Sequence, residues 1–295
     1  MFSKRHSSSL HYIQLATNPA NNVPESTLPL AEVKEVLDTA LARYNRVTFI
    51  LDDPVSIPHR YTLKADIEIA GFLAALFAWG QRKTVLAKAE QVLQLMEDEP
   101  ANFLKSSSPP EWNRFQTFVH RTFNGQDLIW LLQRLRMLYR HSEGLETCFS
   151  HPPKQAEFAV EQGLIRLHKH FFSPSEAPKR TRRHLASPEQ GSACKRLNMF
   201  LRWMVRSDAE GIDFGLWKAL KPAQLICPLD VHSARTARAL GLLSRKQNDW
   251  RAALELTHNL RKLDPNDPIK YDVALFSLSH ARFIQESFSS ENHSH

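Results

Sequence analysis

Residues 66–80 place the strongest constraint on how this chain folds. They read D-I-E-I-A-G-F-L-A-A-L-F-A-W-G, and in a helix their apolar side chains would cover nearly the whole circumference. A helix of this kind must be covered by other elements on all sides, so we predict that it lies at the centre of the protein. Asp66 is suited to cap its first amides, and Gly80 is suited to end it.

The remaining sequence shows helical periodicity and no convincing strand alternation. Helices are predicted near residues 29–46, 81–96, 130–139, 154–172, 193–206, 214–220, 231–240, 249–263 and 268–285. Proline-containing stretches at 51–64 and 173–192 predict an extended connection and a loop. We therefore predict an all-α protein.

Composition limits the class of protein and its partners. Of the 295 residues, 42% are apolar and 23% are charged, which is typical of a globular protein. The net charge of +7 favours polyanionic partners such as nucleic acid. Three widely spaced cysteines predict free thiols in a reducing cytosol: Cys148, Cys194 and Cys227. Neither a membrane-spanning run nor a signal peptide is recognisable, so we expect a cytoplasmic protein with no membrane association.

The predicted helix at 193–206 carries a line of basic residues. Lys195, Arg202 and Arg206 fall within about 40° of one another on a helical wheel, opposite an apolar side. This line is either a solvated basic face or a surface that faces phosphates. In the second case Lys195 is a candidate nucleophile, because a helix start, a neighbouring arginine and partial burial all disfavour its charged form. An uncharged lysine amine can form a Schiff base.

Asp230 precedes the predicted helix at 231–240. Its simplest role is to cap that helix by accepting hydrogen bonds from amides near His232 and Ser233. A carboxylate fixed in this way also points in a defined direction and stays ionised. It is therefore a candidate to stabilise a cationic sugar or to steer a proton.

Two stretches resemble the helix-hairpin-helix DNA glycosylases of the endonuclease III group. P-L-D-V-H-S-A-R-T-A-R-A-L-G-L resembles their V-D-T-H-V-x-R-V-x-x-R-L-G-L, with Asp230 on the catalytic aspartate. His232 and Arg235 fall on the histidine and the arginine of that motif. Upstream, E-I-A-G-F-L-A-A-L-F-A-W-G-Q-R-K-T resembles the early helix of the family and its S-A-Q-A-T loop. There Gln81 falls on a residue that enters the DNA in relatives.

The chain as a whole is also similar to a bacterial family known only as a conserved domain of unknown function. The runs K-R-L-N-M-F-L-R-W-M-V-R and D-P-I-K-Y-D-V-A-L-F carry that similarity. The sequence departs from the glycosylases in two places. E-Q-G-S-A-C, with Gly191, replaces the glycine-rich hairpin before the lysine, and the four cysteines of an iron–sulfur cluster have no counterpart. We expect no cofactor and no metal.

The resemblance implies two helical lobes with a cleft between them. We expect a flexible arm at 1–28, a central lobe at 65–205, a second lobe formed by 29–64 and 206–285, and a disordered tail at 286–295. Lys195 and Asp230 would face each other at the mouth of the cleft in a monomeric protein.

The function that the resemblance implies is base excision from double-stranded DNA, with lyase activity. Lys195 would attack the anomeric carbon of the sugar, and Asp230 would stabilise charge. Residues expected to contact the DNA are Gln81, Arg82, Lys83, Lys179, Arg180, Arg182, Arg183, Arg202, Arg206, His232 and Arg235. Two alternatives stay open: a nucleic-acid-binding protein without catalysis on the same scaffold, and a helical interaction protein with a solvated basic loop.

Overall fold

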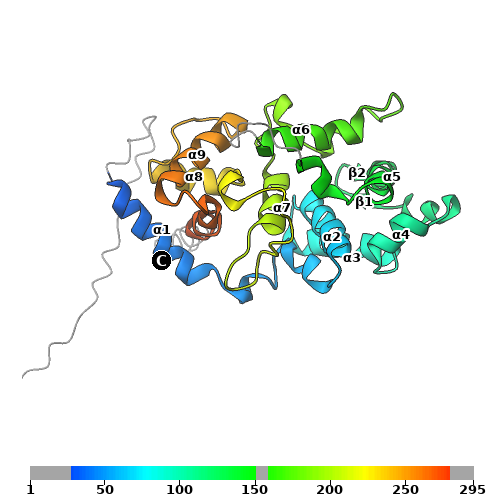
Figure 1. Cartoon of the computed structure of the whole chain (residues 1–295), viewed down its shortest axis with the longest axis horizontal. Helices are drawn as coiled ribbons and strands as arrows, with labels where there is room; N and C mark the ends of the chain where they lie inside the picture. Colours follow the sequence, from blue (N-terminus) through cyan, green and yellow to red (C-terminus); the bar gives the residue numbers. More distant parts are fainter. Residues whose placement is uncertain (1–27, 151–158, 280–295) are drawn as a thin grey trace, which may run out of the picture.

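The computed structural model describes residues 28–150 and 159–279, and these are mainly helical (Figure 1). The helices are α1 (Leu30–Tyr44), α2 (Lys64–Phe77), α3 (Arg82–Leu95), α4 (Pro100–Ser106), α5 (Gly125–His141), α6 (Ala159–Phe172), α7 (Lys195–Val205), α8 (Val231–Ala239) and α9 (Trp250–Leu263). Residues 271–279 are also helical. One short hairpin pairs β1 (Val119–His120) with β2 (Phe123–Asn124) in antiparallel fashion. The predicted all-α class is confirmed, whereas the predicted tail and all but the last residue of the predicted arm lie outside the described residues.

Helix α2 is the buried central helix that the sequence predicts. All of its residues from Asp66 to the end of the helix are buried, and it packs against α3, α4 and α7. Its ends differ from the prediction. Asp66 lies inside the first turn, where its Oδ1 accepts a hydrogen bond from the amide of Ala101 at 2.8 Å and so fastens the start of α4. The helix ends at Phe77, before Gly80.

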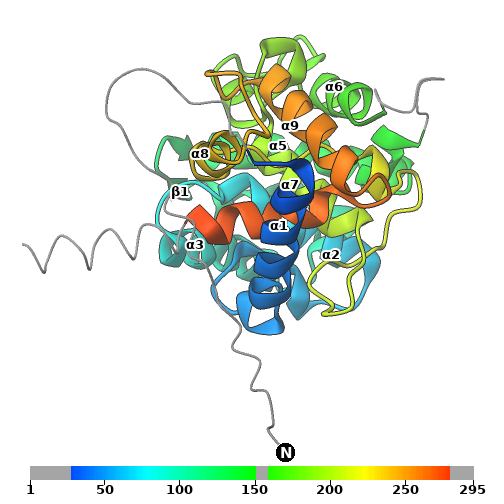
Figure 2. The ribbon, with the colours of Figure 1, turned by 90° about the vertical axis from the view of Figure 1, so that its left-hand side faces the viewer.

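Helix α7 lies between two groups of helices. Figure 1 shows α1, α8 and α9 on one side of α7 and α2 to α5 on the other, and Figure 2 shows the α1 side face-on. A continuous apolar core joins them, with Leu37 of α1, Phe72 of α2, Trp203 of α7 and Leu256 of α9 fully buried in it. The boundaries of the two predicted lobes stay a prediction.

The predicted helix at 214–220 is wrong. In its place the chain runs without helical structure along the end of α7, with the amide of Phe214 donating to Trp203 O and that of Trp217 to Met204 O, at 2.7 and 2.8 Å. These bonds satisfy carbonyls that the last turn of a helix otherwise leaves free. The Trp217 indole also donates to Glu68 Oε1 of α2 at 2.5 Å, which fixes the segment against the central helix.

The predicted exposed basic face of α7 is also wrong for two of its members. Arg202 and Arg206 are only 4% and 5% exposed. Asp213 accepts from both of them, at 3.3 Å from Arg202 Nε and 2.7 Å from Arg206 Nη1. Arg202 also pairs with Asp272 at 2.6 Å, and Arg206 pairs with Asp267 at 2.8 Å. The helical wheel placed the basic line correctly, but the line faces buried carboxylates, so these two arginines cannot reach a phosphate.

This buried ionic network gives a stability prediction. Replacing Asp213, which is 4% exposed, with alanine leaves two buried guanidinium groups without a shared partner. We expect the Asp213→Ala variant to lose about 3 kcal/mol of unfolding free energy in denaturant titrations, because breaking a buried ion pair on one side is costly. Lys34→Ala removes an exposed pair with Asp38 and serves as the control, with an expected loss below about 1 kcal/mol. Equal, small losses in the two variants would contradict this account.

Candidate functional site at the starts of two helices

Lys195 and Asp230 come together although 35 residues separate them in the sequence. Lys195 is the first residue of α7, and Asp230 is the N-cap of α8. Lys195 Nζ lies 3.7 Å from Asp230 Oδ2, and the two side chains are 32% and 25% exposed. An amine and a carboxylate therefore meet at a partly open surface where two helices begin.

The two carboxylate oxygens of Asp230 have different partners. Oδ1 accepts hydrogen bonds from the amides of His232 and Ser233, each at 2.9 Å, and the Ser233 hydroxyl accepts from the Asp230 amide at 3.0 Å. The predicted helix cap is thus confirmed. Because the amides fix Oδ1, the direction of the carboxylate is set, and Oδ2 is the oxygen that faces Lys195.

The Lys195 ammonium lies close to further buried charges. Burial raises the pKa of the Asp272 carboxyl, while Arg202 and Lys195 oppose that shift. Burial likewise raises the pKa of Asp53, against the attraction of Arg202, Arg82 and Lys195. Lys195 Nζ also approaches the sulfur of Met199, one helical turn along α7, at 3.8 Å. Lys195 is therefore a partly exposed member of a charge cluster in which Arg202 and Asp272 are buried.

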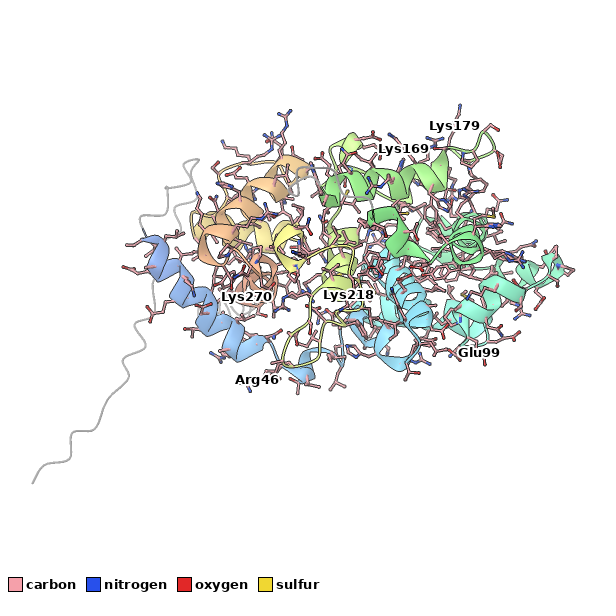
Figure 3. All side chains as sticks on the ribbon, in the orientation of Figure 1. Arg46, Glu99, Lys169, Lys179, Lys218 and Lys270 are labelled. Carbon is pink, nitrogen blue, oxygen red and sulfur yellow. The ribbon has the colours of Figure 1, made fainter. Side chains whose placement is uncertain are left out.

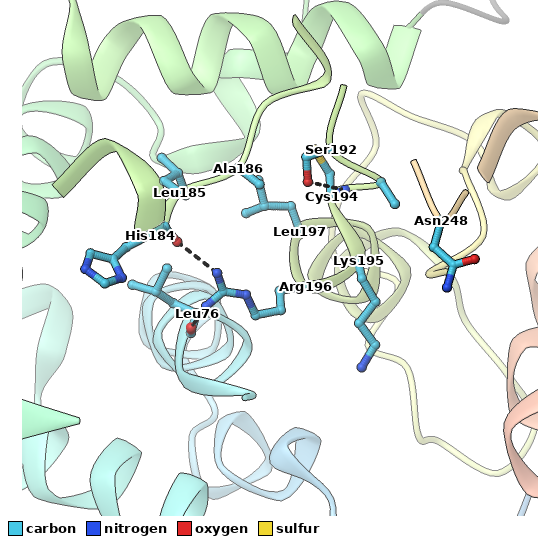
Figure 4. Close-up of a pocket in the computed structure, with 11 residues that line it drawn as sticks. Leu76, His184, Leu185, Ala186, Ser192, Cys194, Lys195, Arg196, Leu197 and Asn248 are labelled. Carbon is cyan, nitrogen blue, oxygen red and sulfur yellow. Dashed lines mark hydrogen bonds between the residues drawn. The ribbon is translucent and has the colours of Figure 1, made fainter. Parts of the chain in front are cut away.

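A cavity of about 250 Å³ adjoins the start of α7. Its wall includes Lys195, Arg196, Leu76 and His184, with Asn248 at another edge. In Figure 4 the Arg196 side chain runs toward Leu76 and His184, whereas Lys195 points away from both. The Arg196 guanidinium donates to the carbonyls of these two residues, the second at 3.1 Å. It forms no ion pair with any described carboxylate, and burial lowers its pKa to about 10.

A tight turn leads into α7. Gly191 ends the short helical turn Pro188–Gln190 with a φ of +73°, and Cys194 adopts a φ of +50° directly before α7. The carbonyl of Gly191 accepts from the amide of Trp250 at 3.0 Å, which ties this turn to the start of α9. Cys194 offers no side-chain cap, so the first amides of α7 add to the positive character of this end of the helix.

Most of the predicted DNA-contacting residues lie on the surface. Those that are exposed are Gln81, Arg82, Lys83, Lys179, Arg180, Arg182, Arg183, His232 and Arg235. Figure 3 shows Lys179 projecting from the edge of the molecule beyond α6. Arg180 pairs with the buried Asp127, and Arg182 donates to Phe172 O at 2.8 Å, so both are partly committed to holding their own loop. Arg235 donates to the hydroxyl of Ser279 at 3.3 Å.

The sequence patterns did not identify two residues that lie close to the site in the folded protein. Asp272 lies 77 positions after Lys195, and no local pattern connects the two. Arg196 entered the sequence argument only as a charge beside Lys195, although it lines the cavity and contacts two other segments. The absence of acidic residues from 190 to 207 does not single out Arg196, because the same stretch contains Arg202 and Arg206, which pair with carboxylates further along the chain.

Comparison with known proteins identifies the family. The family described as "Protein of unknown function (DUF2400)" matches residues 53–281, which include α2 to α9 and both members of the Lys195–Asp230 pair. The chain belongs to this family. No curated protein and no solved structure gives a significant match. Within 28–150 and 159–279, the structure contains no helix with the length and apolar character needed to cross a membrane, and no group of three or more metal-ligating side chains.

Two substitutions of Asp230 separate its capping role from any chemical role. Asparagine caps helices about as well as aspartate, whereas alanine does not. We expect Asp230→Asn to unfold at the wild-type denaturant midpoint and Asp230→Ala to lose about 1 kcal/mol. A marked loss for Asp230→Asn would instead show that the contact with Lys195 stabilises the fold.

His184 gives a pH prediction. This ring is 4% exposed, and burial lowers its pKa to about 4, with Asp127 opposing the shift and Arg183, Arg180 and Arg196 adding to it. His184 is therefore neutral near pH 7, and its approach to Asp127 at 3.6 Å is not an ion pair there.

Because the unfolded ring titrates near about 6.5, unfolding takes up a proton between that pH and 4. The free energy of unfolding should therefore fall by about 2 to 3 kcal/mol as the pH drops through this window. A His184→Gln variant cannot titrate at this position and should lack this component of the pH dependence. Parallel pH profiles for the two proteins would disprove the assignment.

Proposed function

We propose that this protein is a DNA glycosylase with lyase activity, in which Lys195 forms a Schiff base with the sugar. The observation that carries the proposal is the 3.7 Å approach of Lys195 Nζ to Asp230 Oδ2 at a partly exposed position. Stabilisation of the fold gives little reason for such an arrangement, because exposed ion pairs contribute about 1 kcal/mol or less to the free energy of unfolding. A lysine amine next to a fixed carboxylate is, by contrast, what imine chemistry on a sugar requires.

The proposed reaction uses only groups of the chain and of the substrate. The lone pair of the Lys195 amine attacks C1′ of the deoxyribose, and the bond between C1′ and the base breaks, with its electron pair leaving on the base. A proton from the attacking nitrogen balances the charge of the departing base. The C1′–O4′ bond then breaks as the nitrogen lone pair forms the protonated imine, and O4′ takes up the proton that Asp230 received from Lys195. In the lyase step Asp230 accepts the proton that leaves C2′, and the C3′–O bond breaks with its electron pair leaving on the 3′ phosphate. The base must be extruded from the duplex for C1′ to be reached.

Asp230 has two parts in this proposal. With Oδ1 held by two amides, Oδ2 stays in place to stabilise the positive charge that develops on the sugar. The same oxygen is positioned to accept the proton that Lys195 must lose, since it is 3.7 Å from Nζ. The Arg196 charge in the adjoining cavity and the positive end of α7 favour a phosphate of the same strand nearby.

A nucleic-acid-binding protein without catalysis is the second candidate. The observation in its favour is that the contacts of Asp230 are already accounted for by a helix cap and one ion pair. The many exposed basic residues would then serve binding alone. Covalent trapping distinguishes the two candidates, because only the first forms an imine.

The test is borohydride reduction in the presence of duplex DNA with an abasic site or an oxidised base. We expect a covalent protein–DNA adduct with the wild type and none with Lys195→Ala. Lys270→Ala is a matched control, because Lys270 also pairs with an aspartate, Asp264, and has a similarly shielded side chain. That variant should trap at the wild-type level. Adduct formation by Lys195→Ala, or no adduct on any lesion in a broad panel, would reject the proposal.

A second measurement tests Asp230. Asp230→Asn keeps the cap but removes the negative charge, so base release should slow by about 100-fold or more while DNA affinity is retained. Single-turnover rates with saturating enzyme measure this step without interference from binding. If this variant released the base at the wild-type rate, Asp230 would act as a helix cap and have no part in the chemistry.

A further inference from the structure

Four segments without a single acidic residue meet around Trp79. They are residues 69–89, 112–126, 177–188 and 190–207. The Trp79 ring lies 5.4 Å from the ring of His120 and 6.2 Å from that of His184. The guanidinium carbons of Arg121 and Arg196 lie 5.1 and 5.9 Å from its centroid. Trp79 therefore gathers two arginines and two histidine rings from three other segments, and neither arginine forms an ion pair with a described carboxylate.

Arg121 occupies the turn of the β1–β2 hairpin in an unusual conformation. Its φ is +55°, in the left-handed region that favours glycine, yet the position holds a long basic side chain. Gly80, with a φ of +114°, allows the close approach, because a Cβ there would lie 3.0 Å from Arg121 Nη1. Arg121 is exposed and forms no ion pair with a described carboxylate. Strain of this kind persists where the surrounding structure maintains it, and it often marks a functional position.

Two further guanidinium groups gather at the same turn. Arg180 and Arg183 both donate to the carbonyl of Thr122, at 2.5 and 3.4 Å. The nearby carboxylate is Asp127, whose side chain is 1% exposed and already accepts from Arg180 and from the Thr181 hydroxyl. Three arginines therefore meet at the hairpin turn, and Asp127, the carboxylate among the described residues that pairs with one of them, is buried and bonded to Arg180 and Thr181.

We propose that this hairpin surface, formed by Arg121, Arg180 and Arg183, binds backbone phosphates of the nucleic acid whose sugar lies at Lys195. The inference rests on the proposed function, and it adds Arg121 and the hairpin turn to Arg180 and Arg183, which the sequence already suggests as DNA contacts. Guanidinium groups pair with phosphate through two parallel hydrogen bonds. Arg180 pairs with Asp127, whereas Arg121 and Arg183 form no ion pair with a described carboxylate, so these two are the members best suited to a polyanion. Arg196 connects the two regions, because it contacts Trp79 on one side and adjoins Lys195 in the chain.

The test compares two variants that each remove one positive charge. Arg121→Gly suits the left-handed turn, so the fold should be kept. Arg43→Ala is the matched control, because Arg43 is also exposed, lies over an aromatic ring and forms no ion pair with a described residue. It belongs to α1, which Figure 1 places at the opposite end of the molecule from β1. Affinity for an abasic-site duplex is measured at several salt concentrations, with circular dichroism as the folding check.

We expect Arg121→Gly to weaken binding at low salt about three- to tenfold. Its slope of log affinity against log salt should be smaller by about one unit, as for the loss of one phosphate contact. Arg43→Ala should keep the wild-type affinity and slope. Arg183→Ala, which leaves the turn sequence intact, is expected to act like Arg121→Gly.

Several outcomes would overturn the inference, and they are distinguishable from failure of the proposed function. If the wild type binds and traps DNA while Arg121→Gly and Arg183→Ala keep its affinity and slope, the hairpin surface is not a phosphate site and the Lys195 chemistry stands. If Arg121→Gly loses binding to polyglutamate as much as to DNA, the surface is a general anion patch that fits an acidic protein equally well. If the wild type binds no duplex at all, the proposed function itself fails.

Discussion

The interaction on which the arrangement of this protein depends is the pairing of two buried arginines, one in the last turn of α7 and one directly after it, with carboxylates from later segments. A buried guanidinium group stays charged, and nearby carboxylates offset the cost of removing it from water. Arg202 and Arg206 find them in Asp213, Asp272 and Asp267. These contacts hold the loop after α7 and the start of the 271–279 helix against α7. They set the position of the later part of the chain, including α8, relative to the central helix.

The basic side chains along one line of α7 differ in their exposure to solvent. At its far end the basic side chains are almost fully buried and each has more than one carboxylate. At its start, Lys195 is a third exposed, with Asp230 as its one partner within ion-pair distance among the described residues. The rigid end fixes the direction of the helix, and the open end presents the amine. Under the proposed function this division suits a reactive group, because its supporting contacts would lie away from the surface where a substrate binds.

The sequence predicted the elements well where a local pattern determines them. The apolar circumference of α2, the cap at Asp230 and the periodicity of α9 each appear in the structure. It failed where a partner far along the chain decides the outcome. The segment at 214–220 has apolar residues at helical spacing, but its amides bond to the end of α7 and Trp217 bonds to Glu68. For the same reason the exposure of Arg202 was not predictable, since the carboxylates that cover it are 11 and 70 residues away.

The family of this chain is described as one of unknown function, so an argument about its chemistry must start from the site itself. Lys195 and Asp230 have two purely structural explanations, a surface ion pair and a helix cap. The cap explains Oδ1 fully and Oδ2 not at all. The ion pair explains Oδ2, but it gives no account of the cavity beside the lysine or of the uncompensated Arg196 in its wall. Under the proposed function, a phosphate-bearing sugar would account for all three, since its anion would meet Arg196 and its anomeric carbon would meet the amine. We prefer a chemical role for the pair because one ligand would explain all three features together.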